Sequence, residues 1–195
     1  MGDELIVGAN LFATNTYHLH PLIPMPLPPA ASEPRVMSSN RNSPIGYQAL
    51  RRGRWSTPGY RYLVTFTTMR RAARFADPIA GQAVASAMAN PDAWAGAELA
   101  AWVLMPDHAH VVLALSAKSE LSGVVKCAKA RMAMACNRAV CTTGSVWAKG
   151  FHDRGLRTDA EWRAAVRYVL FNPVRAGMVV APENYPWLGC SGRRE

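Results

Sequence analysis

Two short apolar segments, 98–105 and 110–115, are separated by little more than the turn residues Pro106-Asp107. So short a link predicts that they are strands lying side by side in one sheet. Alternation over 60–69 predicts a further strand, with one face formed by Tyr60, Tyr62, Val64 and Phe66. The pattern therefore favours an antiparallel sheet as the centre of the fold.

Helices are predicted between these strands. An Ala-rich stretch over 79–90 ends at a proline, and a longer helical stretch covers 119–141. The segment 145–157 is mixed and predicts a short strand with a loop.

The clearest helix begins at Thr158, which forms a T-x-x-E capping box with Glu161. It must end by Asn172, because Pro173 disfavours the α conformation in the residue before it. The resulting order, β-α-β-β-α-β-α, predicts an α+β, ferredoxin-like antiparallel sheet with helices packed on one face. The other face would then be free to hold a ligand.

The 195 residues suggest one folded domain, predicted over 46–190. Residues 1–45 differ from the rest, since they are rich in Pro, Ser and Asn and lack periodicity. This composition predicts a flexible extension. An over-extended reading frame, with translation starting at Met37, is the other explanation that the sequence leaves open.

The net charge is +9 and unevenly placed. Residues 37–195 hold 21 of the 22 basic and 10 of the 13 acidic residues, a net of +11. This excess favours nucleic acid as a partner ahead of a membrane surface. The alternative is that the positive charge only keeps the protein in solution.

No membrane span is expected, since no apolar run approaches about 18 residues. Asp3 and Glu4 also argue against a secretory leader. The four cysteines form no CxxC pair, and as reduced thiols they favour the cytoplasm.

The segment Met105-Pro106-Asp107-His108-Ala109-His110 contains two histidines at alternate strand positions. Their side chains would project together, about 7 Å apart at their bases, where they could converge on one divalent metal. Two half-exposed strand histidines without a ligand would show the same pattern. A second HxH, His18-Leu19-His20, lies in the Pro-rich extension and is assigned no function.

Tyr168 and Asn172 are four residues apart on the last predicted helix and would share one face. A helical tyrosine commonly packs in a core, and an Asn before Pro commonly ends a helix. Together they suggest a phenol nucleophile with an amide oxygen one turn away that could complete a metal site.

Three motifs in order, MPDHAHVV, GSVWAKGFHDRGLRTDAEWRAAVRYVLFNPVRAGMV and the Tyr185-Pro186-Trp187 tail, resemble the REP-associated tyrosine transposases. These belong to the HUH superfamily of single-strand DNA transposases, with an IS200-like transposase domain. The resemblance covers roughly 46–188 and implies an HUH-endonuclease type of fold. It implies that His108 and His110 are metal ligands, Tyr168 the nucleophile and Asn172 the third ligand.

The implied activity is metal-dependent cleavage and rejoining of single-stranded, hairpin-containing DNA through a 5′-phosphotyrosine intermediate. Mg²⁺ or Mn²⁺ would be the cofactor. The oligomeric state, monomer or homodimer, stays open. The alternative is a catalytically silent nucleic-acid-binding module of the same fold.

Further residues could contact DNA by virtue of charge or position, although each could equally be a solvated surface residue. These candidates are Arg51, Arg52, Arg54, Arg70, Arg71, Lys126, Lys129, His152 and Arg154. Trp147, Phe151 and Trp162 could stack on bases, but aromatic residues at such spacing more often belong to the core.

Overall fold

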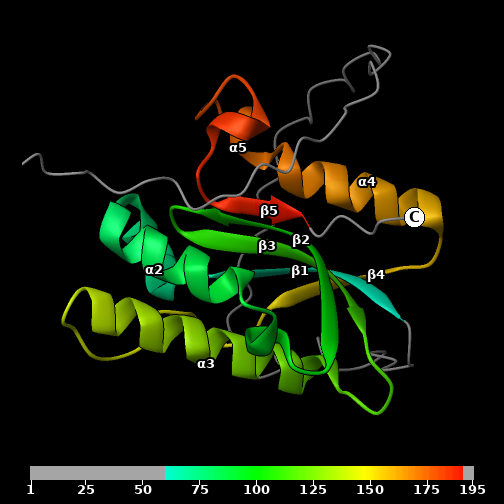
Figure 1. Cartoon of the computed structure of the whole chain (residues 1–195), viewed down its shortest axis with the longest axis horizontal. Coiled ribbons are helices and arrows are strands. Elements are labelled where there is room, and N and C mark those ends of the chain that lie inside the picture. The colour runs from blue at the N-terminus through cyan, green and yellow to red at the C-terminus, as the bar shows by residue number, and fades with distance from the viewer. Residues whose placement is uncertain (1–59, 191–195) are drawn as a thin grey trace, which may run out of the picture. The chain divides into compact units, whose positions relative to one another are not determined.

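The computed structural model describes residues 60–190, so the predicted extension over 1–45 lies outside it. Five strands form one sheet in the order β4-β1-β3-β2-β5, and all neighbouring pairs are antiparallel (Figure 1). The strands are β1 (Arg61–Thr67), β2 (Ala97–Met105), β3 (His108–Leu115), β4 (His152–Leu156) and β5 (Leu188–Cys190).

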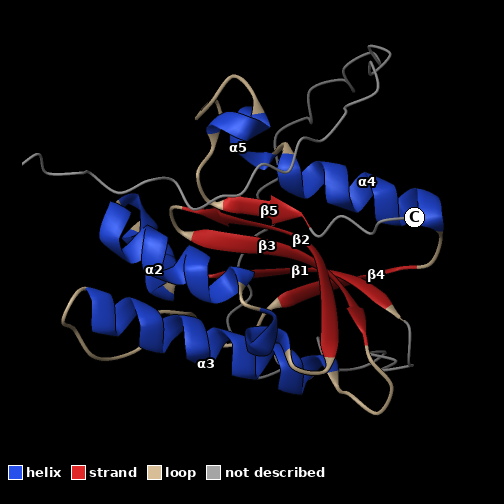
Figure 2. Ribbon diagram, in the orientation of Figure 1, coloured by secondary structure: helices blue, strands red, loops and turns tan. Residues whose placement is uncertain are grey.

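The α-helices flank this sheet on both sides (Figure 2). They are α2 (Pro78–Ala89), α3 (Leu121–Ala139), α4 (Asp159–Leu170) and the short α5 (Asn172–Arg175). None of the helices within residues 60–190 is long and apolar enough to cross a membrane. The predicted α+β class with an antiparallel sheet is confirmed.

Local sequence signals explain where the helices begin. Asp77 caps α2 by accepting hydrogen bonds from the backbone amides of Ile79 and Ala80. The capping box of Thr158 and Glu161 is present at the start of α4, as predicted. Each cap satisfies amides that lack a partner within the helix.

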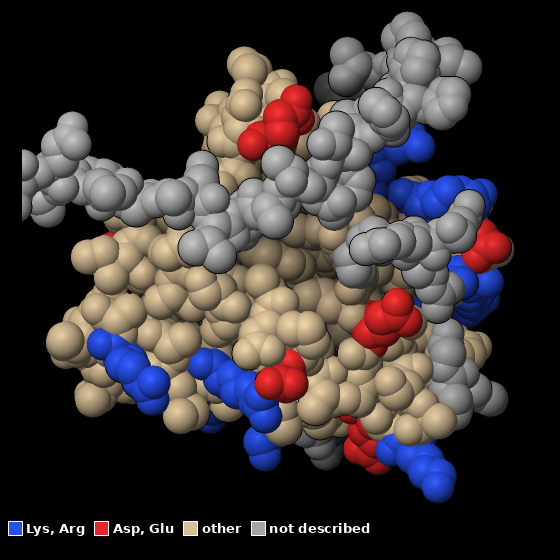
Figure 3. Space-filling model, viewed as in Figure 1, with Lys and Arg blue, Asp and Glu red and all other residues tan. Residues whose placement is uncertain are grey.

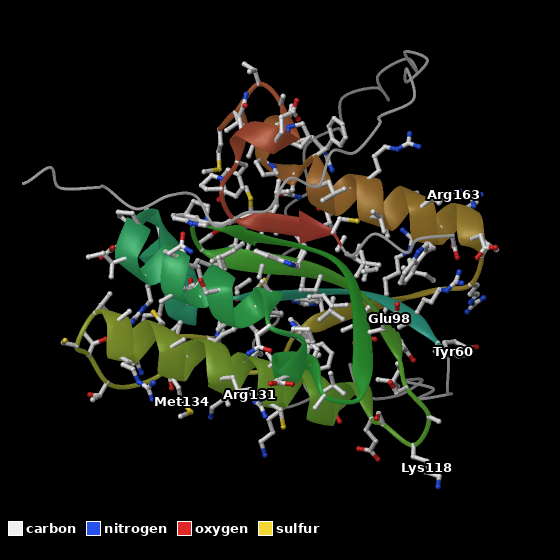
Figure 4. The ribbon with its side chains drawn as sticks, in the orientation of Figure 1. Tyr60, Glu98, Lys118, Arg131, Met134 and Arg163 are labelled. Atoms are coloured by element: carbon white, nitrogen blue, oxygen red, sulfur yellow. The ribbon has the colours of Figure 1, made fainter. Side chains whose placement is uncertain are left out.

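The larger core lies between the sheet and the pair α2 and α3. Strand β1 contributes alternate residues to it, including the buried Val64 and Phe66. Val84 of α2 and Met132 of α3 are fully buried against this face. The alternation predicted for the first strand is therefore confirmed. Side chains on the far side of α3, such as Arg131 and Met134, point away from the sheet (Figure 4).

A smaller core covers the opposite face, where α4 packs on the sheet through Ala165 and Val169. Its partners on the strands include Val103 and Val112. The prediction that helices pack on one face only is therefore wrong for α4. Helix α4 has an apolar stripe, which is buried only where it lies against another apolar surface. The second face of the sheet provides that surface.

The sequence pattern did not predict β5, which adds a three-residue edge strand to β2. A Cβ atom at Gly189 would lie only 2.6 Å from the indole nitrogen of Trp102, so a larger residue there would force the Trp102 ring or the strand to shift. This glycine lets the last strand approach the sheet closely enough to pair with it.

Candidate functional site

The site is built on the first residues of β3. His108 and His110 project from the face that α4 covers, whereas Ala109 between them is buried in the larger core. The two imidazole ring centroids are 4.8 Å apart, and the rings are nearly perpendicular. The predicted placement of both rings on one face is confirmed.

Each imidazole has one ring nitrogen engaged by a neighbouring side chain. Nδ1 of His110 lies 2.7 Å from the hydroxyl oxygen of Thr65, and Nδ1 of His108 lies 2.6 Å from a carboxylate oxygen of Asp107. No hydrogen bond within residues 60–190 engages Nε2 of either ring. Both rings thus present their outer nitrogen toward a possible ligand.

His110 is largely buried, with 7% of its surface exposed. Burial, together with smaller electrostatic contributions from His108, Arg175 and Arg71, lowers its pKa from 6.5 to about 4. The imidazole of His110 is therefore neutral near pH 7, and a neutral imidazole is the form that binds a metal.

Helix α4 brings Tyr168 to this pair. The ring centroid of Tyr168 lies 5.4 Å from that of His110, in an edge-to-face arrangement. The buried neighbours Ala165 and Val169 fix the rotation of the helix, and Tyr168 itself is only half buried. A strand and a helix far apart in the sequence therefore place a phenol beside two imidazoles.

Two arginines flank the cluster. The guanidinium carbon of Arg175, at the end of α5, lies 4.8 Å from the centre of the Tyr168 ring. Arg71 pairs with Asp107, its Nε lying 3.0 Å from the second carboxylate oxygen. Arg70 and Arg71 both have positive φ, 58° and 56°, which is uncommon for residues other than glycine. The surroundings therefore favour an anionic ligand.

Asn172 does not continue the helix that carries Tyr168. Helix α4 ends at Leu170, and Asn172 begins the short helix α5, with Phe171 between them. The expected end of the helix by Asn172 is confirmed, but the two residues do not share a face of one continuous helix. The side-chain amide of Asn172 makes no hydrogen bond to any residue in the described range.

Two donors of a metal site are therefore assembled by β3 itself. Imidazole nitrogens with their inner atoms held by a carboxylate or hydroxyl are typical metal ligands, so the residues fit a divalent ion. Within residues 60–190, no cluster of three or more His, Cys, Asp or Glu side chains is arranged to hold a metal. A further ligand from this part of the chain would thus be of another kind, such as an amide.

The predicted DNA-contact residues fall in different places. Arg51, Arg52 and Arg54 lie outside the described residues. On the face shown in Figure 3, basic side chains lie over both α3 and α4. Lys126 is exposed on α3, the helix that covers the face opposite the histidine pair. Of the predicted residues that the structure describes, Arg71 contacts the site through its ion pair with Asp107.

The remaining candidates have structural partners. The ammonium group of Lys129 donates to the carbonyls of Ala148 and Gly150, at 2.8 and 2.6 Å. Arg154 lies 3.4 Å from Glu161, and His152 is the exposed register partner of Thr65 on the neighbouring strand. Lys129 thus ties down a loop, whereas His152 lies one strand from the site.

Among the aromatic candidates for base stacking, Trp147 is buried between Phe66 and Phe75, with ring centroids 4.7 and 5.0 Å away. Trp162 packs on the smaller core with Arg61 over its ring. Phe151 packs against the larger core. Trp147 is therefore a core residue, as the alternative to base stacking predicted.

The other tyrosines of the described residues lie in different settings. Tyr185 is buried and its hydroxyl donates to the carbonyl of Leu104 at 2.8 Å; burial raises its pKa to about 12. Tyr62 is buried in the larger core, and Tyr60 is 38% exposed beside it. Tyr168 is therefore the tyrosine of this part of the chain that lies beside the histidine pair.

Sequence reasoning missed Thr65, Asp107 and Arg175 as members of this cluster. Alternation in the first strand gave a usable signal for Thr65, because it faces the opposite side from Val64 and Phe66. Asp107 adjoins His108 in the sequence. No sequence signal placed Arg175, because its position depends on the break between α4 and α5.

The domain is a single antiparallel sheet with helices on both faces. Two histidines and a tyrosine meet on the face that α4 covers. The model of the family described as "Transposase IS200 like" matches residues 56–169. The chain therefore belongs to the IS200-like transposase family.

Two solved structures are similar to this chain, and the first supports the same fold. A REP-associated tyrosine transposase bound to a REP hairpin is 22% identical, with a TM-score of 0.57, and the match covers 78% of this chain and 82% of that one. A transposase-like protein of Deinococcus radiodurans R1 is 21% identical, with a TM-score of 0.44 and coverage of 62% and 95%. A comparison with curated protein sequences finds no match.

Proposed function

We propose that this protein is a metal-dependent transposase that cleaves and rejoins single-stranded DNA containing a hairpin. The observation that carries the proposal is the contact between the Tyr168 and His110 rings, 5.4 Å apart, with His108 beside them. A helical tyrosine that served only packing would have no need of a polar imidazole against its ring.

Tyr168 is the proposed nucleophile. Its phenol oxygen attacks the phosphorus of a phosphodiester and forms a 5′-phosphotyrosine bond, while the bond from phosphorus to the 3′ oxygen breaks. The phenol gives up its proton and the departing 3′ oxygen gains one, so the products are a covalent adduct and a free 3′-OH. Attack by this 3′-OH in the reverse direction would rejoin the strand.

His108 and His110 are the proposed ligands of the divalent ion, with the amide oxygen of Asn172 as the third. The ion, Mg²⁺ or Mn²⁺, would supply charge that polarises the phosphate oxygens. His110 suits this role because it is buried and neutral near pH 7. Arg175 and Arg71 add positive charge beside the ring cluster, where the anionic phosphate would lie.

Hairpin DNA is the proposed substrate for two reasons. Residues 37–195 carry a net charge of +11, which favours a polyanion. The similar transposase structure was solved bound to a REP hairpin. We expect the reaction to take place in the cytoplasm, because the four cysteines form no CxxC pair and reduced thiols are typical of that compartment.

The experiment is incubation of the full-length protein with end-labelled single-stranded hairpin DNA and Mg²⁺, followed by denaturing gel electrophoresis. A labelled species that migrates with the protein and disappears with protease is the expected result. The variant His108→Ala/His110→Ala should form no such species, whereas His18→Ala/His20→Ala, the matched HxH control, should behave as wild type. DNA binding without any adduct would instead favour a catalytically silent binding module.

A further inference from the structure

We propose that Thr65 and Asp107 are positioning residues, which hold the imidazoles of His110 and His108 so that both Nε2 atoms face the metal. This inference rests on the proposed function, since it concerns the same two histidines. It adds two residues that neither touch the reacting atoms nor belong to the predicted ligand set.

Thr65 acts on His110 across two neighbouring strands. The two residues are direct register partners of β1 and β3, and the threonine hydroxyl lies 2.7 Å from Nδ1 of the ring. The contact is partly buried, so water competes with it only weakly. A single hydroxyl thus fixes the orientation of the deeper of the two rings.

Asp107 acts on His108 from the adjacent turn. One carboxylate oxygen lies 2.6 Å from Nδ1 of His108, and the other lies 3.0 Å from Nε of Arg71. The backbone carbonyl of Asp107 also accepts hydrogen bonds from the amide and hydroxyl of Thr68, at 2.9 and 3.0 Å. The carboxylate is therefore held on both sides while it orients the ring.

The two partners differ in what they impose. An ionised carboxylate only accepts hydrogen bonds, so Nδ1 of His108 must carry the proton and Nε2 must carry the lone pair. A hydroxyl can either donate or accept, so the tautomer of His110 is free to follow the ligand. Asp107 therefore fixes His108 in the tautomer that can bind a metal through Nε2, even without a metal. The tautomer of His110 would be set only on metal binding.

The test measures Mn²⁺ affinity of the full-length protein by electron paramagnetic resonance of the free ion, without DNA. Thr65→Val, which keeps the branched shape, and Asp107→Asn should each weaken Mn²⁺ binding about tenfold or more, as is typical when the partner of a metal-bound histidine is lost. Thr65→Ser should restore binding, because it restores the hydroxyl.

Two matched controls should bind Mn²⁺ as wild type does. Thr143→Val changes the same residue type at an exposed position remote in sequence from β1 and β3. Asp92→Asn changes an exposed aspartate remote in sequence from the turn at Asp107. A loss of affinity in either control equal to that in Thr65→Val would overturn the assignment.

The outcomes separate the two proposals. If Thr65→Val and Asp107→Asn bind Mn²⁺ like wild type while His108→Ala/His110→Ala does not, the positioning role is wrong and the metal site stands. If the double histidine variant binds normally, both are wrong. Nitrogen NMR of the metal-free wild type gives an answer even if a variant fails to fold: the His108 proton is expected on Nδ1, and a proton on Nε2 would overturn the proposal.

Discussion

On the side of the sheet covered by α2 and α3, β3 contributes Ala109, Val111 and Leu113 to a core of apolar side chains. On the other side the same strand contributes His108 and His110, which use hydrogen-bonding partners rather than apolar neighbours at their inner nitrogens. One strand thus serves two purposes through its alternation. The first face supplies stability through buried area, whereas the second holds polar groups that cost stability unless they are paired.

The largest expected effect is on the apolar face. Leu113 is fully buried, so Leu113→Ala should lower the free energy of unfolding by about 2–5 kcal/mol, through lost burial and the cavity left behind. Urea unfolding followed by circular dichroism measures it. Tyr168→Phe on the other face should change the free energy by much less, and equal losses would remove the distinction between the two faces.

Low pH should reduce the stability of the protein through His110. The pKa of His110 is about 4 in the folded protein against its ordinary value of 6.5, so the unfolded chain binds the proton more tightly between these values. Stability should therefore rise with pH from about 4 to about 6.5, by about 3 kcal/mol at most. Urea unfolding of metal-free wild type and His110→Gln across this range measures the difference. A constant difference between the two proteins would contradict the shift.

The cap of α4 tests whether the helix that carries Tyr168 depends on local signals. Thr158→Ala removes the side chain that accepts from the amide of Glu161 and should cost about 1 kcal/mol. The midpoint of urea unfolding should fall, whereas DNA cleavage under folding conditions should persist. Loss of cleavage without loss of stability would mean that the cap acts on the site itself.

The smallest effect concerns charge on the two sides. Arg175 lies beside Tyr168, so Arg175→Gln should reduce the salt dependence of single-stranded DNA binding by about 0.7 log units per log unit of salt, the amount for one phosphate contact. Lys126→Gln, on the helix over the apolar face, is the matched comparison. Fluorescence anisotropy at several salt concentrations measures both slopes. Equal changes would place DNA on both sides of the molecule.

Much of this contrast could be predicted from local pattern. Alternation in the first strand, the turn at Pro106-Asp107 and the capping box at Thr158 each depend on neighbouring residues, and each was found in the structure. The shared face of His108 and His110 follows from the same two-residue period.

Other features depend on contacts distant in the sequence. The covering of the second face by α4 was not predictable from the helix itself, because any apolar surface could have buried its stripe. The contact between Thr65 and His110 requires the register of β1 against β3, which the sequence pattern leaves undefined. Arg175 lies over the Tyr168 ring from α5, a separate short helix whose position relative to α4 the sequence pattern does not define.

The central claim is that Tyr168 is the residue that becomes covalently attached to DNA. The most direct measurement is peptide mass mapping of the adduct trapped with hairpin DNA and Mg²⁺, together with the variant Tyr168→Phe, which removes one oxygen at nearly constant volume. The account predicts the nucleotide mass on the peptide containing Tyr168, and no adduct with the variant despite unchanged DNA affinity. Nucleotide mass on another tyrosine, or cleavage by Tyr168→Phe, would contradict it.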